Sequence, residues 1–421
     1  MDRRVLLKTG GLAAVGIVSG GCANRAARMR PQQSYVSLPL VEAAWDRIIR
    51  TTVGLRPHRA SGFHLRAERL DAKTVIHNYG HGGAGHSLGW GTGALVAEMA
   101  LEHSDRRAAV IGCGTVGLTA ARQLQRRGFD VTIYAKSVPP HTTSNKALAG
   151  FTPTSGLVDA NLRTPGWDVQ FRRAAEISYE QLQLLVGRGY GVSWINTYRF
   201  MNELPQPRQP TRTSAAAPRI PQNTSAPPLR PPGTRVGGVI LHPGKHPFPS
   251  RYATRAPWLR IEPAIYLERL MRDVIYFGGH IAIREFTSLE DLVTLNESLV
   301  INSTGLGARE LFSDDELIAL KGQLTMLVPQ REVNYGTFGG VPGRARGGFY
   351  HMIPRSDGLA LGGTSQLGDW SLEPDEDARR RIVDTHLQLF NAMQAPDPNA
   401  RLSAVGPGGT PRLESFYGLE S

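Results

Sequence analysis

A strand, a glycine-rich turn, a helix and a second strand follow one another in the middle of the chain. Ala108-Ala109-Val110-Ile111 is apolar enough for a buried strand, and the turn Gly112-Cys113-Gly114-Thr115-Val116-Gly117 comes directly after it. Leu118 to Arg127 has the apolar spacing of a helix, and Asp130-Val131-Thr132-Ile133-Tyr134 has that of a second strand. In this context the G-x-G-x-x-G pattern predicts a dinucleotide-binding unit, with a pyrophosphate at the N-terminus of the helix.

One residue of such a unit is missing. An acid usually ends the second strand and binds a ribose hydroxyl, but Ala135 and Lys136 stand there instead. A lysine at this place could favour the 2′-phosphate of NADP. The motif alone therefore does not decide which dinucleotide is bound.

A second glycine-rich stretch runs from His77 to Gly91 and reads HNYGHGGAGHSLGWG. Each glycine inside a regular element costs roughly 0.5–1 kcal/mol relative to alanine, so we expect neither an ordinary helix nor a strand here. Such a stretch suits backbone groups that approach a flat or anionic ligand. We expect a strand to end at Ile76 and a helix to run from Thr92 to His103. His77 and His81 would pair as metal ligands only on a helix, so no metal site is expected.

Composition limits the class of protein. A chain of 421 residues suggests two or three domains, and 41% hydrophobic with 20% charged residues is typical of a globular protein. The net charge of +12 could attract anions, but the basic residues are scattered and no nucleic-acid-binding module is present, so we expect no nucleic acid partner. The two cysteines, Cys22 and Cys113, exclude a disulfide framework and a cysteine-built zinc site.

The N-terminus resembles an export signal. Arg3 and Arg4 precede a small apolar run from Gly10 to Gly21, as in twin-arginine signals, and the run is too short to span a bilayer. Ser19-Gly20-Gly21-Cys22 resembles a degenerate lipoprotein cleavage box. Cys22 is then either lipidated or lost with the signal. We expect a bacterial protein that is periplasmic or lipid-anchored, with membrane contact only through Cys22.

The two glycine-rich motifs together resemble those of the D-amino-acid oxidase family of flavoproteins. Four further segments agree with that family: Gly54-Leu55-Arg56-Pro57, His141-Thr142-Thr143-Ser144, Val300–Gly305 and Leu361–Trp370. The resemblance covers most of residues 50–400. It implies FAD as the cofactor and a fold of α/β plus α+β type, with a Rossmann-type FAD-binding domain and a mixed-sheet substrate domain. In the family the dinucleotide motif opens the chain and the His-Asn-Tyr-Gly motif closes it, so this chain looks circularly permuted.

The resemblance also predicts domain ranges. A proline-rich insert without apolar periodicity, residues 203–236, is expected to be disordered. The other ranges are the signal with its lipobox (1–22), the first part of the FAD-binding domain (23–200), a substrate-domain part (237–286), the rest of the FAD-binding domain (287–312), the rest of the substrate domain (313–390) and a surface tail (391–421).

Individual roles are implied as well. Arg56 would hold the substrate α-carboxylate with its planar guanidinium, and the Gly83 carbonyl would accept a hydrogen bond from the substrate amine. Gly82, Gly85, His86 and Ser87 would face the flavin ring. The remaining cofactor-binding residues would be Gly112, Gly114, Val116, Gly117, Thr142, Thr143 and Ser144.

The wall of the substrate pocket has two candidates. The family has a tyrosine shortly before an Ile-Ile-Pro-like strand, and the segment here is Gly348-Phe349-Tyr350-His351-Met352-Ile353-Pro354. Counted back from Pro354, the position falls on His351. Side chains alternate along a strand, so only one of the two can easily face the substrate. We choose Tyr350, which requires a register shift or a bulge.

The implied activity is the FAD-dependent oxidative deamination of D-amino acids. A hydride would pass from the α-carbon to the flavin, the imino acid would hydrolyse to a keto acid, and oxygen would be reduced to hydrogen peroxide. Three alternatives stay open: a flavin dehydrogenase with another electron acceptor, an NADP-dependent reductase, and an exported binding protein without catalysis. The sequence fixes neither side-chain specificity nor oligomeric state.

Overall fold

The computed structural model describes residues 33–148, 150–204, 229, 237–342 and 349–394. These residues form a six-stranded and a nine-stranded sheet, both within the unit Tyr35–Ser421. The signal with Cys22, most of the proline-rich insert and the end of the surface tail lie outside the described residues. None of the helices in the described ranges is long and apolar enough to cross a membrane.

The six-stranded sheet contains the predicted dinucleotide-binding unit. Its strand order is β2 (His64–Leu70), β3 (Lys73–Tyr79), β10 (Leu299–Asn302), β4 (Arg107–Ile111), β5 (Asp130–Ala135) and β9 (His280–Ile283). All neighbours pair in parallel except β2, which is antiparallel to β3. β4, α2 (Thr115–Gln125) and β5 form the strand–helix–strand unit, so that prediction is confirmed.

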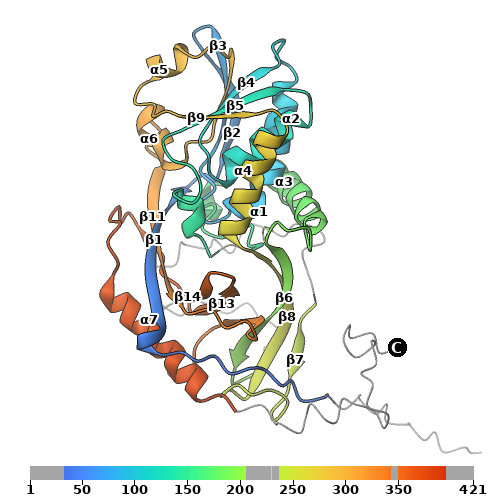
Figure 1. The fold of residues 1–421 in the computed structure, drawn as a ribbon, viewed down its shortest axis with the longest axis vertical. Helices are drawn as coiled ribbons and strands as arrows, with labels where there is room; N and C mark the ends of the chain where they lie inside the picture. The colour runs from blue at the N-terminus through green and yellow to red at the C-terminus, as the bar shows by residue number, and fades with distance from the viewer. Residues whose placement is uncertain (1–32, 149, 205–228, 230–236, 343–348, 395–421) are drawn as a thin grey trace, which may run out of the picture. The chain divides into compact units, whose positions relative to one another are not determined.

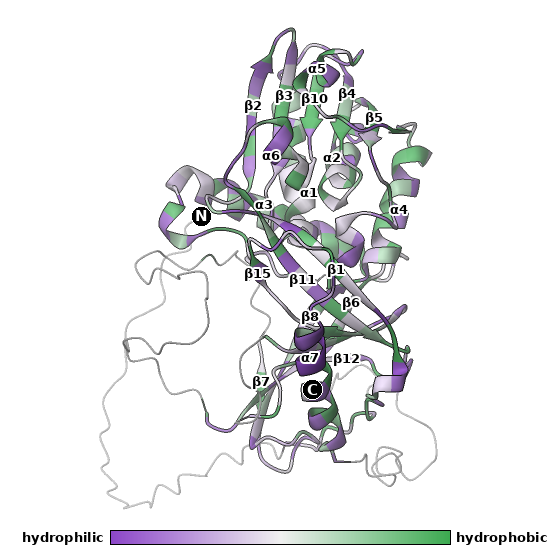
Figure 2. Ribbon diagram, turned by 90° about the vertical axis from the view of Figure 1, so that its left-hand side faces the viewer, coloured by the Kyte–Doolittle hydropathy of each residue, from purple (hydrophilic) through white to green (hydrophobic). Residues whose placement is uncertain are grey.

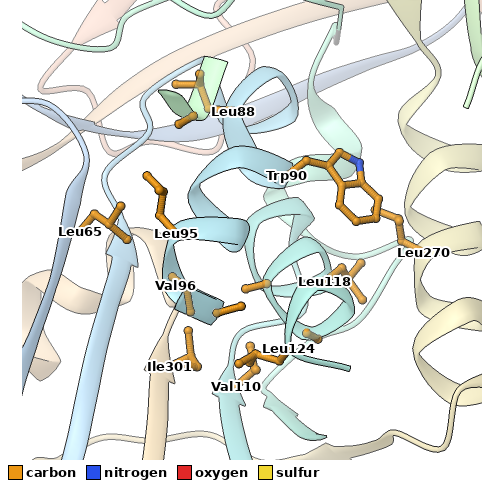
Figure 3. Packing of buried hydrophobic residues seen from close by; sticks show 14 of the residues in the cluster. Leu65, Leu88, Trp90, Leu95, Val96, Val110, Leu118, Leu124, Leu270 and Ile301 are labelled. Carbon is orange, nitrogen blue, oxygen red and sulfur yellow. The ribbon is translucent and has the colours of Figure 1, made fainter. Parts of the chain in front are cut away.

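Helices cover both faces of this sheet, as an α/β domain requires. One face carries α1 (Gly85–Ala100), α2, α3 (Pro165–Leu184) and α4 (Pro263–Tyr276), and the other carries α5 (Leu289–Val293) and α6 (Ala308–Leu311) (Figure 1). The central strands β10 and β4 are mostly hydrophobic along their length (Figure 2). Between sheet and helices lies a core that includes Leu88, Trp90, Leu118, Val110 and Ile301 (Figure 3).

Helix α1 begins inside the glycine-rich stretch, at Gly85, so the prediction of an irregular segment followed by a helix from Thr92 is wrong there. The glycines allow close helix packing. A Cβ at Gly91 would overlap the backbone of Ala174 in α3, and one at Gly89 would lie 2.8 Å from Oγ1 of Thr119 in α2. Tertiary contacts therefore outweigh the poor helix propensity of glycine.

The nine-stranded sheet is mixed. Its order is β1 (Ile48–Arg59), β11 (Leu317–Leu327), β14 (Gly358–Gly362), β13 (His351–Arg355), β12 (Tyr335–Phe338), β6 (Val192–Met201), β8 (Tyr252–Ile261) and β7 (Val239–Leu241), and β15 (Gln366–Leu367) also pairs with β11. Among the described strands of this sheet, only the pair β12–β6 is parallel. Helix α7 (Glu376–Asn391) packs Ile382, Leu389 and Phe390 into the second core. Four 3₁₀ helices complete the described elements: η1 (Trp45–Arg47), η2 (Thr143–Lys146), η3 (Ala160–Leu162) and η4 (Gly305–Gly307).

The sheets divide the chain at other residues than the predicted domain ranges. β1 and β6 belong to the nine-stranded sheet, although the range 23–200 assigned them to the FAD-binding domain. β9 belongs to the six-stranded sheet, although the range 237–286 assigned it to the substrate domain. Apolar alternation predicts a strand but does not indicate which sheet the strand joins, because that depends on distant partners.

Candidate active site

A cavity of about 1180 Å³ lies where the two sheets meet. Its walls come from the loops after β3, β4, β5 and β10, from the first turns of α1 and α2, and from β1, β11, β12 and β13. All but three of the predicted site residues line it: Arg56, Gly82, Gly83, Gly85, His86, Gly112, Gly114, Val116, Thr142, Thr143, Ser144 and His351. The three that do not are Ser87, Gly117 and Tyr350.

The turn between β4 and α2 forms one end of the cavity. Gly112 has φ +113, and a Cβ there would overlap the Ser303 carbonyl. Gly117 does not face the cavity, because it packs against the Gly112 carbonyl, where a Cβ would also overlap. Gly114 caps α2 without a side-chain hydrogen bond, and the Thr115 amide donates to Ser144 Oγ at 3.0 Å. Thr115 and Val116 in the first turn of α2 line the cavity, and the amides at a helix N-terminus that have no intrahelical partner suit an anion.

The glycine-rich turn ahead of α1 forms the next wall. Gly82 has φ +52, and a Cβ there would overlap the Gly156 carbonyl. The Gly83 amide donates to the Ser155 carbonyl at 2.9 Å, while no hydrogen bond to the Gly83 carbonyl is found in the described part of the chain. Ser87 lies behind this wall: its Oγ donates to the Gly150 carbonyl at 3.0 Å and accepts from the Thr152 amide at 2.8 Å. It therefore holds the neighbouring loop and does not face the cavity.

Buried histidines stand next to the turn. Burial lowers the pKa of His81 to about 3 and, together with the Arg355 charge, the pKa of His86 to about 4. Both rings are therefore neutral at pH 7. His81 shares a hydrogen bond with Thr92 Oγ1 (3.1 Å), which leaves its other nitrogen without a partner among the described residues.

Arg56 extends from β1 into the cavity. Its Nε donates to the Leu320 carbonyl at 3.1 Å and its Nη2 to the Thr364 carbonyl at 3.0 Å. Burial lowers the pKa of Arg56 to about 10, so the guanidinium stays charged at neutral pH. Within the described ranges no carboxylate forms an ion pair with it. A Cβ at Gly322 would lie 3.2 Å from Nη2, so the glycine makes room for this cation.

Of the two wall candidates, His351 lines the cavity and Tyr350 does not, so the choice of Tyr350 is wrong. Tyr350 is 4% exposed and packs in the second core, beside the ring of His386. No register shift occurs: β13 pairs in register from His351, opposite Gly362, to Arg355. The alternation of side chains along the strand then turns residues 350 and 351 to opposite faces.

The His351 imidazole is buried, and neither ring nitrogen has a hydrogen-bond partner among the described residues. Burial lowers the pKa of His351 to about 3, and the charge of Arg56 contributes to that shift. A neutral imidazole in a cavity next to a guanidinium can donate one hydrogen bond and accept another.

Comparisons with known proteins show the family of this chain. The family model described as "FAD dependent oxidoreductase" matches residues 107–414. The chain belongs to the D-amino-acid oxidase family of FAD-dependent oxidoreductases. A D-amino-acid oxidase of Rubrobacter xylanophilus is 30% identical over 329 residues, covering 74% of this chain and 89% of that protein. Human D-aspartate oxidase is 25% identical over 292 residues, covering 66% and 74%. The glycine oxidase structure from Bacillus cereus aligns with a TM-score of 0.44 at 12% identity, covering 69% and 81%.

The family match begins at the first residue of β4. Residues 33–106 precede it, yet they supply the strands β2 and β3 of the six-stranded sheet, the helix α1 and Arg56. The circular permutation itself stays a prediction.

The cavity suits FAD, the cofactor of the family. The α2 N-terminus with Gly114 and Thr115 would hold the pyrophosphate. Polar atoms that are buried and unpartnered among the described residues line the same cavity, and they would gain partners from a polar cofactor: Asn78 Nδ2 and Oδ1, His86 Nε2, Thr115 Oγ1 and Ser303 Oγ. Such groups are costly when they stay unpaired, so a bound ligand accounts for them.

An aromatic wall of the substrate region was not foreseen. The rings of Trp258 and Phe338 meet edge to face at 5.8 Å, and Phe338 stacks on Phe349 at 5.7 Å. All three residues line the cavity, and a Cβ at Gly150 would overlap the Trp258 ring. They come from β8, β12 and the segment before β13, and no local motif links strands so far apart in the chain.

Proposed function

We propose that this oxidoreductase oxidises the CH–NH₂ group of D-amino acids and uses oxygen as the electron acceptor. The observation that carries the proposal is the Arg56 guanidinium, which faces the cavity without a carboxylate partner among the described residues. An unpaired guanidinium fork suits a planar carboxylate.

The Arg56 strand and the Gly83 turn are directly connected. The Gly82 amide donates to the Pro57 carbonyl at 2.7 Å, and His58 and His81 form an isolated antiparallel bridge. The cation and the Gly83 carbonyl are therefore held at a fixed separation. A carboxylate on Arg56 and an amine on the Gly83 carbonyl describe an α-amino acid, oriented before any chemistry occurs.

The other walls supply an apolar surface and a polar group at one point. Trp258, Phe338 and Phe349 give an apolar surface for the substrate side chain. The neutral His351 can donate a hydrogen bond to the substrate without bringing a second charge. FAD held at the α2 turn would supply an acceptor for the α-carbon hydride and a route for two electrons to oxygen, so that the products would be hydrogen peroxide and an imino acid that hydrolyses to a keto acid and ammonia. No side-chain base is needed in this scheme.

The D configuration and the acceptor are supported by the relatives, whose names include D-amino-acid oxidases and D-aspartate oxidases. A turnover assay tests both. Purified enzyme is supplied with matched D- and L-amino acids, glycine, sarcosine and D-aspartate, and the keto acid and peroxide are measured. We expect one peroxide per keto acid from D substrates. A keto acid that appears only with an artificial dye would indicate a dehydrogenase, and turnover of L substrates would contradict the proposal.

We also propose that the enzyme is exported after it has bound FAD in the cytoplasm. The support is the Arg3-Arg4 pair before the small apolar run, because twin-arginine signals carry folded proteins. Cell fractionation of the full chain and of an Arg3→Lys/Arg4→Lys variant tests this. Cytoplasmic location of both proteins would contradict export, and labelling with a radioactive fatty acid would show whether Cys22 is lipidated.

A further inference from the structure

The dinucleotide motif lacks its ribose-binding acid, and a neighbouring strand brings other side chains to the same edge of the sheet. β5 ends at Ala135, and Lys136 follows at the edge where such units hold the ribose. β9 pairs with β5 in parallel, with Ile283 opposite Ala135. The chain after β9 therefore leaves the sheet at the same edge, and its Arg284, Glu285 and Phe286 line the cavity together with Lys136.

The backbone of this segment is fixed. The Arg284 amide donates to the Ala135 carbonyl at 3.1 Å, which extends the β5–β9 pairing by one bond. The Arg284 side chain donates to Thr294 Oγ1 at 2.8 Å and lies over the Phe286 ring at 4.8 Å. Phe286 in turn meets Tyr134 edge to face at 6.0 Å. Glu285 stands between two anchored residues.

The Glu285 carboxylate has capacity left for a ligand. Its Oε1 lies 3.4 Å from Lys136 Nζ, and the two side chains are 61% and 72% exposed. An exposed ion pair of this kind contributes little to stability. No donor to Oε2 of Glu285 is found in the described part of the chain. The pairing also offsets the charge of Lys136, which weakens the alternative of a 2′-phosphate bound there.

We propose that Glu285 takes the place of the missing acid and accepts hydrogen bonds from the ribose hydroxyls of the adenosine half of FAD. The ribose carboxylate then comes from the end of the neighbouring strand β9. In this chain the adenosine site is built from two neighbouring strand ends in place of one.

The test compares FAD with FMN, which lacks the adenosine half. Affinities of the FAD-depleted full chain are measured by flavin fluorescence. Glu285→Gln keeps the shape of the side chain and removes its charge, so we expect FAD affinity to fall about 10- to 100-fold, the range of one hydrogen bond to a charged group. FMN affinity should stay unchanged. Lys136→Met serves as the matched control for loss of the ion pair and should change FAD affinity less than about threefold.

A restoring variant makes the test sharper. Adding Lys136→Asp to Glu285→Gln puts an acid at the end of β5, and FAD affinity should recover at least in part. Unchanged FAD affinity in Glu285→Gln would overturn the proposal, as would an equal loss for FMN and FAD. Because the assay contains no substrate, its outcome is independent of the proposed amino-acid oxidation.

Discussion

Replacement of Arg56 by alanine should lower kcat/KM for D-amino acids by roughly 10²–10³-fold. Leaving a buried charge without its partner costs about 3–5 kcal/mol, and each 1.36 kcal/mol is a factor of about ten in rate. Arg56 lies in an open cavity and is only partly buried, so water can reach the substrate carboxylate and the lower part of that range applies. The variant also loses the hydrogen bonds from Nε and Nη2 to the Leu320 and Thr364 carbonyls.

Steady-state peroxide formation measures this loss, with Arg56→Lys as the matched control. Lysine keeps the charge but not the planar fork, so it should recover only part of the activity. The Arg56 hydrogen bonds found among the described residues go to the Leu320, Lys321 and Thr364 carbonyls and not to the α2 turn, so both variants should purify with the same FAD content as the parent enzyme. A loss below about tenfold, worth only ~1.4 kcal/mol, would remove Arg56 from the substrate site.

Three further changes follow from the geometry. Gly91→Ala should destabilise the fold by about 1–3 kcal/mol, because the new Cβ would overlap Ala174, and this would be measured as a lower Tm. The control Gly166→Ala, in α3 with open space around it, should be neutral or stabilising. Trp258→Ala should raise KM for D-phenylalanine more than for D-alanine, and equal effects would place the aromatic wall away from the substrate side chain. The free energy of unfolding, measured by urea at saturating FAD, should be smaller at pH 5.5 than at pH 7.5. In the folded chain, burial holds the pKa of four histidines near 3 or 4, below the unfolded value of about 6.5; these are His81, His86, His351 and His386. The unfolded chain therefore binds more protons than the folded chain between pH 5.5 and pH 7.5. Equal or greater stability at pH 5.5 would contradict this.

The parts of the fold that the sequence predicted are those set by local patterns. The strand–turn–helix–strand unit around Gly112 was predicted to within one residue for both strands and within three residues for the helix, because apolar periodicity and glycine spacing are local signals. The start of α1 at Gly85 was missed, because glycine lowers helix propensity and only the contacts with α2 and α3 reverse that preference. The assignment of β1, β6 and β9 to their sheets also depends on partners that are distant in the chain.

In the candidate site, too, the residues in local motifs were predicted and those placed by contacts between distant segments were not. Motif residues such as Arg56, Gly83 and Gly114 line the cavity as predicted, although their roles stay predictions. The aromatic wall and Glu285 carry no motif, since neighbouring strands bring them to the cavity from separate parts of the chain. The choice between Tyr350 and His351 depends on the register of β13. Counting back from Pro354 gave His351, which is the residue that lines the cavity.

An anaerobic titration of the purified flavoprotein tests the central claim most directly. Without oxygen, a substrate that transfers its hydride bleaches the flavin absorbance and the colour does not return. The account predicts that D-alanine or D-phenylalanine bleaches the flavin of the parent enzyme, that the L enantiomers do not, and that Arg56→Ala needs far higher concentrations. A flavin that no D-amino acid bleaches, or that L-amino acids bleach equally, would contradict it.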